Sequence, residues 1–216
     1  MYPPDGHLFP RYTDCSTCCR LKPGRSKHCN ATGGCVARFD HWCIWLNNAV
    51  GLMNTRWFLA FLAATTATAA YGAALCVAAI RGDMRRRGAW ELVWNDPGSG
   101  RAVGLADDRS LLAAWVFAHY GLAAGVAAFL GIACWIVAGF GGVQVWRVAT
   151  GVTTNEAFKW EEAAAERRER AANSAVAGAQ RLPPNAYDRG WRRNFAEVLF
   201  PRQHLARALR ASRKTQ

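Results

Sequence analysis

Cysteine and histidine crowd the start of this chain, whose first 43 residues hold six of its eight cysteines. Cys15 and Cys18 are separated by two residues and are followed by His28 and Cys35. Three thiolates and one imidazole make a complete tetrahedral set for zinc, and thiolate ligands favour zinc over calcium or magnesium. The sequence therefore predicts one structural zinc ion on Cys15, Cys18, His28 and Cys35.

The thiols have two other possible uses. A disulfide framework would require an oxidising compartment, and nothing in the sequence sends this segment to one. A Cys-x-x-Cys pair can also be a redox pair, but no βαβ pattern surrounds this one. Both uses fit the sequence less well than a metal site does.

A second group, Asp40, His41 and Cys43, has the residue types of an activated nucleophile. Cysteine attacks thioesters well at neutral pH once it is a thiolate. His41 can accept the thiol proton, and Asp40 can fix the tautomer and orientation of the imidazole. The three residues are predicted to form a catalytic group, with Cys43 as the nucleophile.

Two long apolar segments follow these residues and must position them. Residues 57–80 contain no charged residue or histidine, and as a helix they reach about 36 Å, enough to cross a hydrocarbon core of about 30 Å. A buried helix of a soluble protein would show a polar face at this length. Residues 111–146 are longer than one crossing requires, so they are expected to tilt or to project beyond the bilayer. The predicted fold is an α-helical integral membrane protein with two transmembrane helices and a small zinc-binding cysteine-rich domain before the first.

These segments divide the chain into five predicted parts. Residues 1–56 form a cytosolic catalytic domain, 57–80 and 111–146 are transmembrane helices, 81–110 are a lumenal loop, and 147–216 are a cytosolic basic tail. Lysine and arginine number seven in residues 1–56, six in the loop and fourteen in the tail, so the positive-inside rule favours cytosolic ends. The arginines that directly follow the first helix count against this orientation. Residues 1–11 lack an apolar stretch, so no secretory signal is expected.

The stretch CSTCCRLKPGRSKHCNATGGCVARFDHWCIWLNNAVGLMNTRWF closely resembles the cysteine-rich domain of Asp-His-His-Cys protein S-acyltransferases, the palmitoyltransferases. Residues 153–156 match the family's Thr-Thr-x-Glu motif, and NAYDRGWRRNFAEVLF resembles its C-terminal motif, with Asn194 at the asparagine. The resemblance implies ping-pong transfer of a long-chain acyl group from palmitoyl-CoA, or a similar acyl-CoA, to Cys43. The group then passes to a juxtamembrane cysteine of a cytosolic or membrane-associated protein substrate.

The chain also departs from the family pattern. Family members normally bind two zinc ions, but the second set of ligands would fall on Cys29, Thr32, Trp42 and Ala49, of which only Cys29 can bind a metal. Trp42 and the apolar residues 44–46 are expected to replace that metal by packing or by insertion at the bilayer interface. The family usually has four transmembrane helices, so this chain is expected to be a truncated form or fragment, or a reduced protein that forms a homo-oligomer. Two alternatives to the enzyme follow: an adaptor or regulator of another acyltransferase, and a membrane-anchored zinc module.

Basic residues suggest the remaining partners. Side chains near the cysteines could attract CoA phosphates or lipid headgroups, or could be solvated charges: Lys22, Arg25, Lys27, Arg38 and Arg56. Residues 160–180 are expected to form a polar helix with a Glu166–Arg170 pair, and the basic amphipathic segments after Trp191 are expected to lie on the cytosolic leaflet. No nucleic-acid recognition motif accompanies this charge, so nucleic acid is not expected as a partner. No retrieval signal selects an organelle between the endomembranes and the plasma membrane.

Overall fold

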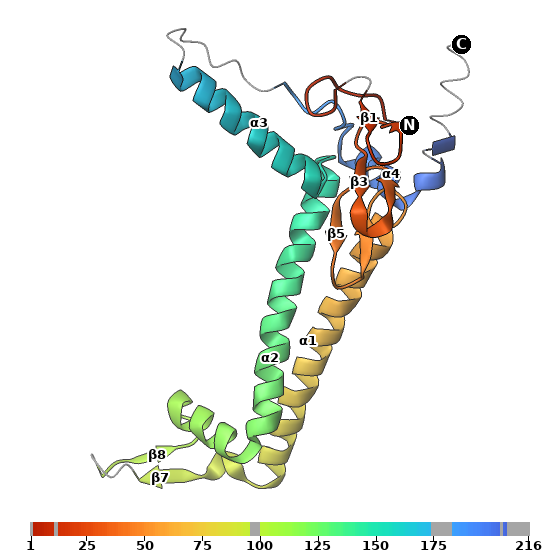
Figure 1. Cartoon of the computed structure of the whole chain (residues 1–216). Coiled ribbons are helices and arrows are strands. Elements are labelled where there is room, and N and C mark those ends of the chain that lie inside the picture. Colours follow the sequence, from red (N-terminus) through yellow and green to blue (C-terminus); the bar gives the residue numbers. More distant parts are fainter. Residues whose placement is uncertain (1, 11–12, 96–99, 174–182, 204, 207–216) are drawn as a thin grey trace. The chain divides into compact units, whose positions relative to one another are not determined.

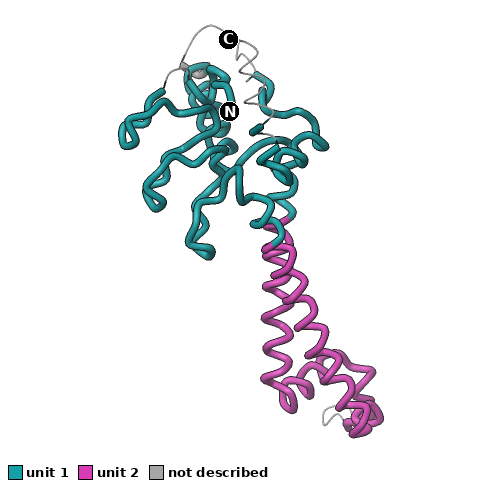
Figure 2. Tube along the Cα trace, turned by 90° about the vertical axis from the view of Figure 1, so that its right-hand side faces the viewer, with its two compact units in different colours: residues 1–60, 142–216 teal, residues 61–141 magenta. Residues whose placement is uncertain are grey.

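A computed structural model describes the chain except for residues 1, 11–12, 96–99, 174–182, 204 and 207–216. The chain divides into two compact units, one of residues 1–60 with 142–216 and the other of residues 61–141 (Figure 2).

The first unit carries three short antiparallel hairpins (Figure 1). They pair β1 (Asp14–Cys15) with β2 (Arg20–Leu21), β3 (Lys27–Cys29) with β4 (Gly34–Val36), and β5 (His41–Cys43) with β6 (Asn48–Val50). A 3₁₀ turn, η1 (Asn30–Thr32), lies between β3 and β4. Two-stranded hairpins of this length are not stable alone in water, so other contacts must hold them.

Two helices of the C-terminal region complete this unit, α3 (Thr154–Asn173) and α4 (Trp191–Leu199). Its apolar core joins the N-terminal segment to the C-terminal region, because Tyr2, Phe9 and Leu52 pack with Tyr187. The predicted polar helix of residues 160–180 lies in α3 as far as Asn173, and its Glu166–Arg170 pair is 3.8 Å apart. The rest of that prediction, and the basic residues from 207 onward, lie outside the described residues.

The predicted apolar face of residues 191–199 is only partly buried. Val198 is buried, but Trp191 and Leu199 are exposed, and two polar residues of α4, Asn194 and Glu197, are buried instead. The helix therefore packs through a mixed face.

Two long apolar helices dominate the fold, α1 (Thr55–Arg86) and α2 (Arg109–Ala149). Each is long and apolar enough to cross a membrane, and only 11% and 6% of their most apolar windows are buried inside the protein. Within residues 61–141 they pack closely, since a Cβ added to Gly72 would lie 2.9 Å from the Leu130 Cδ1 atom. Together with the preceding Cys/His cluster, the helices confirm the predicted fold class, and the segments 57–80 and 111–146 fall within them.

The segment between the two helices has secondary structure of its own. A 3₁₀ turn, η2 (Ala89–Glu91), leads into a hairpin of β7 (Val93–Asn95) with β8 (Ala102–Gly104). Helix α2 is interrupted at Tyr120, where φ is −130° and ψ is 30°.

Candidate active site and metal centre

The four predicted metal ligands lie together in the first unit. The ligand atoms of Cys15, Cys18, His28 and Cys35 all lie within 4.8 Å of one another. The first pair comes from β1 and the tight turn after it, where the Cys19 N–H donates to the Cys15 carbonyl at 2.8 Å. The second pair faces across the β3–β4 hairpin, because His28 and Cys35 are direct cross-strand partners. Two hairpins therefore supply two ligands each.

The spacing of these atoms fits a tetrahedral zinc ion. The Cys18 sulfur lies 3.8 Å from the Cys35 sulfur and 3.2 Å from the His28 Nδ1 atom. Zinc bonds of about 2.3 Å to sulfur and about 2.0 Å to nitrogen would place such atoms roughly 3.8 and 3.6 Å apart. The cluster could thus hold zinc with small adjustments.

The pKa values of the thiols also point to a cation. The backbone N–H of Cys18, 3.4 Å from the Cys15 sulfur, lowers the pKa of Cys15 to about 6. Loss of hydration, and then the neighbouring sulfurs of Cys15 and Cys18, raise the pKa of Cys35 to about 11. A bound metal ion would lower the pKa of Cys35 and keep both Cys15 and Cys35 ionised at neutral pH.

The predicted catalytic residues lie on β5 and directly before it. The His41 Nδ1 atom is 2.6 Å from the Asp40 Oδ2 atom, and the His41 ring packs edge-on against Phe58 with 5.1 Å between centroids. Since side chains alternate along a strand, His41 and Cys43 share one face of β5 while Trp42 points to the other. With Nδ1 engaged by Asp40, the Nε2 atom of His41 remains as the proton acceptor for a thiol.

Asp40 is fixed by the first turn of α3. Its Oδ1 atom accepts a 2.6 Å hydrogen bond from the Thr154 backbone N–H, and its Oδ2 atom accepts one of 3.0 Å from the Thr154 hydroxyl. The Asn155 N–H also donates to the Asp40 carbonyl at 3.1 Å. Burial alone would raise the pKa of Asp40, but the hydrogen bonds from His41 and Thr154 outweigh it and lower that pKa. Asp40 is therefore a carboxylate at neutral pH.

Residues 153–156 form the N-terminal cap of α3. The Thr153 hydroxyl accepts from the Glu156 N–H at 3.2 Å, and the Glu156 carboxylate accepts from the Thr153 N–H at 2.9 Å. This reciprocal pair is a capping box, in which two backbone donors of the first helical turn find acceptors. The cap places Thr154 against Asp40.

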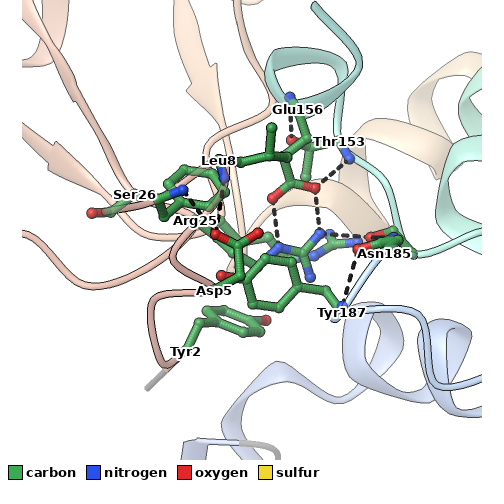
Figure 3. A network of polar contacts seen from close by, with 12 residues as sticks. Tyr2, Asp5, Leu8, Arg25, Ser26, Thr153, Glu156, Asn185 and Tyr187 are labelled. Atoms are coloured by element: carbon green, nitrogen blue, oxygen red, sulfur yellow. Dashed lines mark hydrogen bonds and ion pairs between the residues drawn. The ribbon is translucent and has the colours of Figure 1, made fainter. Parts of the chain in front are cut away.

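The same Glu156 holds the buried Arg25 (Figure 3). The Arg25 Nε and Nη2 atoms donate to the two Glu156 oxygens at 2.6 and 2.7 Å, and Nη2 also donates to the Gly151 carbonyl. Tyr2 and Tyr187 lie over the guanidinium, 5.1 and 4.7 Å away. Burial alone would lower the pKa of Arg25, but Glu156 outweighs it, so the pKa is raised and the guanidinium stays charged.

This buried ion pair corrects one sequence prediction. Arg25 is only 1% exposed, so it neither attracts phosphates nor is solvated. Arg38 is buried as well, with its Nε atom 3.0 Å from the Glu197 Oε1 atom. Both arginines compensate internal carboxylates, which the sequence alone did not reveal because their partners lie more than 100 residues away.

Comparison with known proteins decides the family. The family model described as "DHHC palmitoyltransferase" matches residues 9–161, which include the metal cluster, β5, both long helices and the α3 cap. The chain belongs to the DHHC palmitoyltransferase family. It is 33% identical over 202 residues to "Palmitoyltransferase ZDHHC4" of Mus musculus, which covers 93% of this chain and 57% of that protein.

Fungal relatives are similar to the chain at a comparable level. "Palmitoyltransferase swf1" of Schizosaccharomyces pombe is 31% identical over 219 residues, covering 92% of this chain and 56% of that protein. "Palmitoyltransferase SWF1" of Neurospora crassa is 38% identical over 170 residues, covering 76% of this chain and 39% of that protein. The chain thus spans little more than half the length of the curated relatives it matches, or less.

Of the four positions expected to match the family's second zinc site, three lie in or against an apolar cluster. Cys29 and Ala49 are buried with Phe39, and Val36 and Trp42 pack against them. Thr32, in η1, donates its hydroxyl to the Cys29 carbonyl at 3.2 Å. Trp42 packs against this cluster, whereas Ile44 and Trp45 at the tip of the hairpin are 77% and 89% exposed.

Two family motifs have physical roles that the sequence did not disclose. Thr154 was identified only as part of a motif, yet it makes two hydrogen bonds to Asp40. Asn194 donates to the carbonyl of Ala149, the last residue of α2, and so caps that helix. A capping box at residues 153–156 was readable from the sequence, but its contact with Asp40 was not.

Proposed function

We propose that this chain is a protein-cysteine S-acyltransferase whose nucleophile is Cys43. The observation that carries the proposal is the 2.6 Å contact between Asp40 and His41 directly before Cys43 on one strand. This is the arrangement in which a carboxylate orients an imidazole that takes the nucleophile's proton. Family membership supports the reaction class, and the curated relatives carry the name palmitoyltransferase.

In the first half-reaction, the Cys43 thiol gives its proton to the Nε2 atom of His41 and attacks the carbonyl carbon of a long-chain acyl-CoA. A new carbon–sulfur bond forms to Cys43, the bond to the CoA sulfur breaks, and the CoA thiolate leaves. His41 returns the proton to that thiolate. The Asp40 carboxylate stabilises the imidazolium that exists between the two transfers.

In the second half-reaction, a cysteine of a protein substrate repeats the attack on the acyl-Cys43 thioester. His41 takes the proton of the incoming thiol and gives it to Cys43 as the acyl group departs. Because the enzyme is acylated before the second substrate reacts, the kinetics are ping-pong. The protein substrates are membrane-associated or cytosolic proteins with juxtamembrane cysteines.

Cys15, Cys18, His28 and Cys35 would hold one zinc ion, which supplies a structural cross-link between the β1–β2 and β3–β4 hairpins. The ion takes no part in the transfer steps. Its contribution is to hold the cysteine-rich segment that leads into β5.

The acyl transfer takes place at the boundary of the bilayer. The exposed Ile44 and Trp45 adjoin Cys43 at the tip of the β5–β6 hairpin, and an apolar tip with tryptophan suits the boundary of a bilayer. An acyl chain emerging from the bilayer would then reach Cys43. We assign residues 1–56 and 147–216 to the cytosolic side on the positive-inside rule, with 57–80 and 111–146 as the crossings.

The test is acyl-enzyme formation. Purified protein in membranes is incubated with alkyne-tagged palmitoyl-CoA, and hydroxylamine-sensitive label is measured on the wild type, on Cys43→Ala and on Cys19→Ala. Cys19 is the matched control, because it is an exposed thiol of the same segment outside the metal cluster. Label on the wild type and on Cys19→Ala, but not on Cys43→Ala, supports the proposal.

Two results would contradict it. Equal label on Cys43→Ala would show that Cys43 is not the nucleophile. Absence of label on folded, zinc-loaded wild type would favour an adaptor or regulator built on the same scaffold. The next experiment would then fuse to this chain the segments that the longer curated relatives carry in addition, and repeat the assay.

A further inference from the structure

The far end of the second unit forms one packed element, which we call the far-end cap and define as residues 89–119 without the undescribed 96–99. It contains η2, the β7–β8 hairpin and the first turns of α2 (Figure 1). The Leu105 N–H donates to the Leu92 carbonyl at 2.9 Å and closes the hairpin. A buried cluster ties the cap to the end of α1 through Ile80, Met84, Ala89, Leu105 and Ala124, with Trp90, Leu111, Leu112 and Trp115 packed against it.

The kink at Tyr120 separates the helical part of the cap from the rest of α2. The Tyr120 hydroxyl donates to the Asp83 Oδ2 atom at 2.8 Å, and the same carboxylate oxygen accepts from the Arg87 Nε atom at 2.6 Å. Residues 121–149 alone, at about 1.5 Å of rise per residue, exceed a hydrocarbon core of about 30 Å. Residues 109–119 are therefore not needed for the crossing.

The cap exposes a cluster of apolar side chains, beside exposed charged residues that include Glu91, Arg101 and Asp107. Leu92, Val93 and Trp94 are consecutive, and they are 47%, 64% and 59% exposed. Because neighbouring residues of a strand point to opposite faces, both faces of β7 present apolar side chains. A hairpin in water normally keeps one face polar. On the helical part, Phe117 is 56% exposed, and the exposed residues around it are Ala113, Ala114, Ala118 and His119.

The two long helices of the same unit also expose apolar side chains. Tyr71 and Leu75 of α1 and Leu122 and Phe129 of α2 are exposed apolar side chains of the membrane-crossing candidates. At the level of the cap, the chain supplies the exposed cations of residues 85–87, which suit lipid phosphates, beside tryptophan, which suits the headgroup boundary.

We infer that the far-end cap lies in the headgroup–acyl boundary of the bilayer, with Trp94 and Phe117 embedded, and that it is not an aqueous loop. The partner of this surface is the lipid bilayer itself. The inference does not depend on the acyltransferase activity, since it concerns only residues 61–141. It also replaces the expectation that residues 81–110 are a simple lumenal connection, and it limits the second crossing, assigned above to residues 111–146, to the part of α2 that follows Tyr120.

Fluorescence quenching by brominated lipid tests the inference. The full chain is reconstituted in phosphatidylcholine vesicles as wild type and as Trp94→Phe, and the difference between their spectra isolates Trp94. We expect that difference emission to be blue-shifted and to lose more than half its intensity with lipids brominated near the headgroup. Lipids brominated near the end of the acyl chain should quench it less, and aqueous iodide present on both sides should barely affect it.

Trp90 is the matched control in the same turn of chain, because it packs against the buried cluster. Its difference signal, from Trp90→Phe, should be shielded from both bromine and iodide more than that of Trp94. A second reporter, Phe117→Trp in the Trp94→Phe background, should show the same headgroup-bromine quenching and tests the helical part independently. Iodide quenching of Trp94 with less than half of its emission lost to brominated lipid would overturn the inference.

Discussion

The two hairpins that carry the candidate metal ligands and the β5–β6 hairpin are similar in size and lie in the same unit, yet different contacts hold them. The first two converge on four ligand atoms within 4.8 Å of one another. The third is held by apolar packing around Phe39 and by hydrogen bonds between Asp40 and the first turn of α3. A metal cross-link would need little buried area, whereas the β5–β6 hairpin depends on a segment 114 residues away. The geometry of the candidate metal site is thus local, and that of the proposed catalytic site is not.

Removing one of the four candidate metal ligands should have the largest effect, because it should cost both the bound zinc and the fold of the first two hairpins. In Cys35→Ala, bound zinc should fall from about one equivalent per chain to nearly none, because a tetrahedral site loses one of four ligands. Structural zinc is worth about 10–16 kcal/mol in small zinc domains, so the first two hairpins should unfold. Zinc content by elemental analysis and protease protection of residues 13–36 measure both effects.

Cys29→Ala is the control for that change. Cys29 is buried in the apolar cluster, so losing its sulfur should cost only about 1 kcal/mol and leave zinc in place. Although Cys35 is exposed and Cys29 is buried, the loss of Cys35 should reduce zinc binding more than the loss of Cys29. Equal zinc loss in both variants, or two equivalents in the wild type, would show that Cys29 also serves a metal.

Neutralising the buried ion pair should come next in size. Glu156→Gln leaves the Arg25 guanidinium buried and weakens its two hydrogen bonds to residue 156. Such a change typically lowers the free energy of unfolding by about 3 kcal/mol. For a chain of this size, that corresponds to a fall of about 10 °C in the thermal midpoint. The midpoint is measured by the fluorescence of the purified protein in detergent.

The exposed Glu166–Arg170 pair gives the matched comparison. Its nitrogen and oxygen are 3.8 Å apart and both side chains are largely solvated, so Glu166→Gln should change the midpoint by no more than about 1 °C. If Glu156→Gln and Glu166→Gln have the same thermal midpoint, the buried Arg25–Glu156 pair does not stabilise the unit more than the exposed pair does.

The contrast between local and distant contacts also explains what the sequence could and could not predict. The apolar segments 57–80 and 111–146 and the ligands Cys15, Cys18, His28 and Cys35 were predictable, because composition and short spacing determine them. The break at Tyr120 carries no proline, and the buried roles of Arg25 and Arg38 depend on Glu156 and Glu197. Such pairings require the tertiary fold and cannot be read from local pattern.

The smallest expected effect concerns Thr154, which links α3 to the catalytic hairpin. Thr154→Ala removes the hydroxyl that donates to Asp40 and accepts from the Arg147 Nη1 atom, but it keeps the backbone N–H that also donates to Asp40. Losing the hydrogen bond to the Asp40 carboxylate costs about 1.5 kcal/mol or more, so acyl-enzyme formation should slow about tenfold. Thr150→Ala is the control, because the Thr150 hydroxyl donates only to carbonyls of α2, and it should leave the rate unchanged.

The titration of Asp40 distinguishes this positioning role from a general loss of stability. The pKa of Asp40 is lowered in the folded protein, so its contribution to stability is fully present above the unfolded value of about 3.9 and is lost as pH falls through the lower folded pKa. The difference in stability between wild type and Asp40→Asn should therefore be constant near neutral pH and shrink below about pH 4. Thr154→Ala raises the folded pKa of Asp40 toward its ordinary range, so the loss of stability on acidification should be smaller than in the wild type and should be complete at a higher pH. A Thr154→Ala profile that coincides with the wild type would mean that the Thr154 hydroxyl does not act through Asp40, even if the variant is slow.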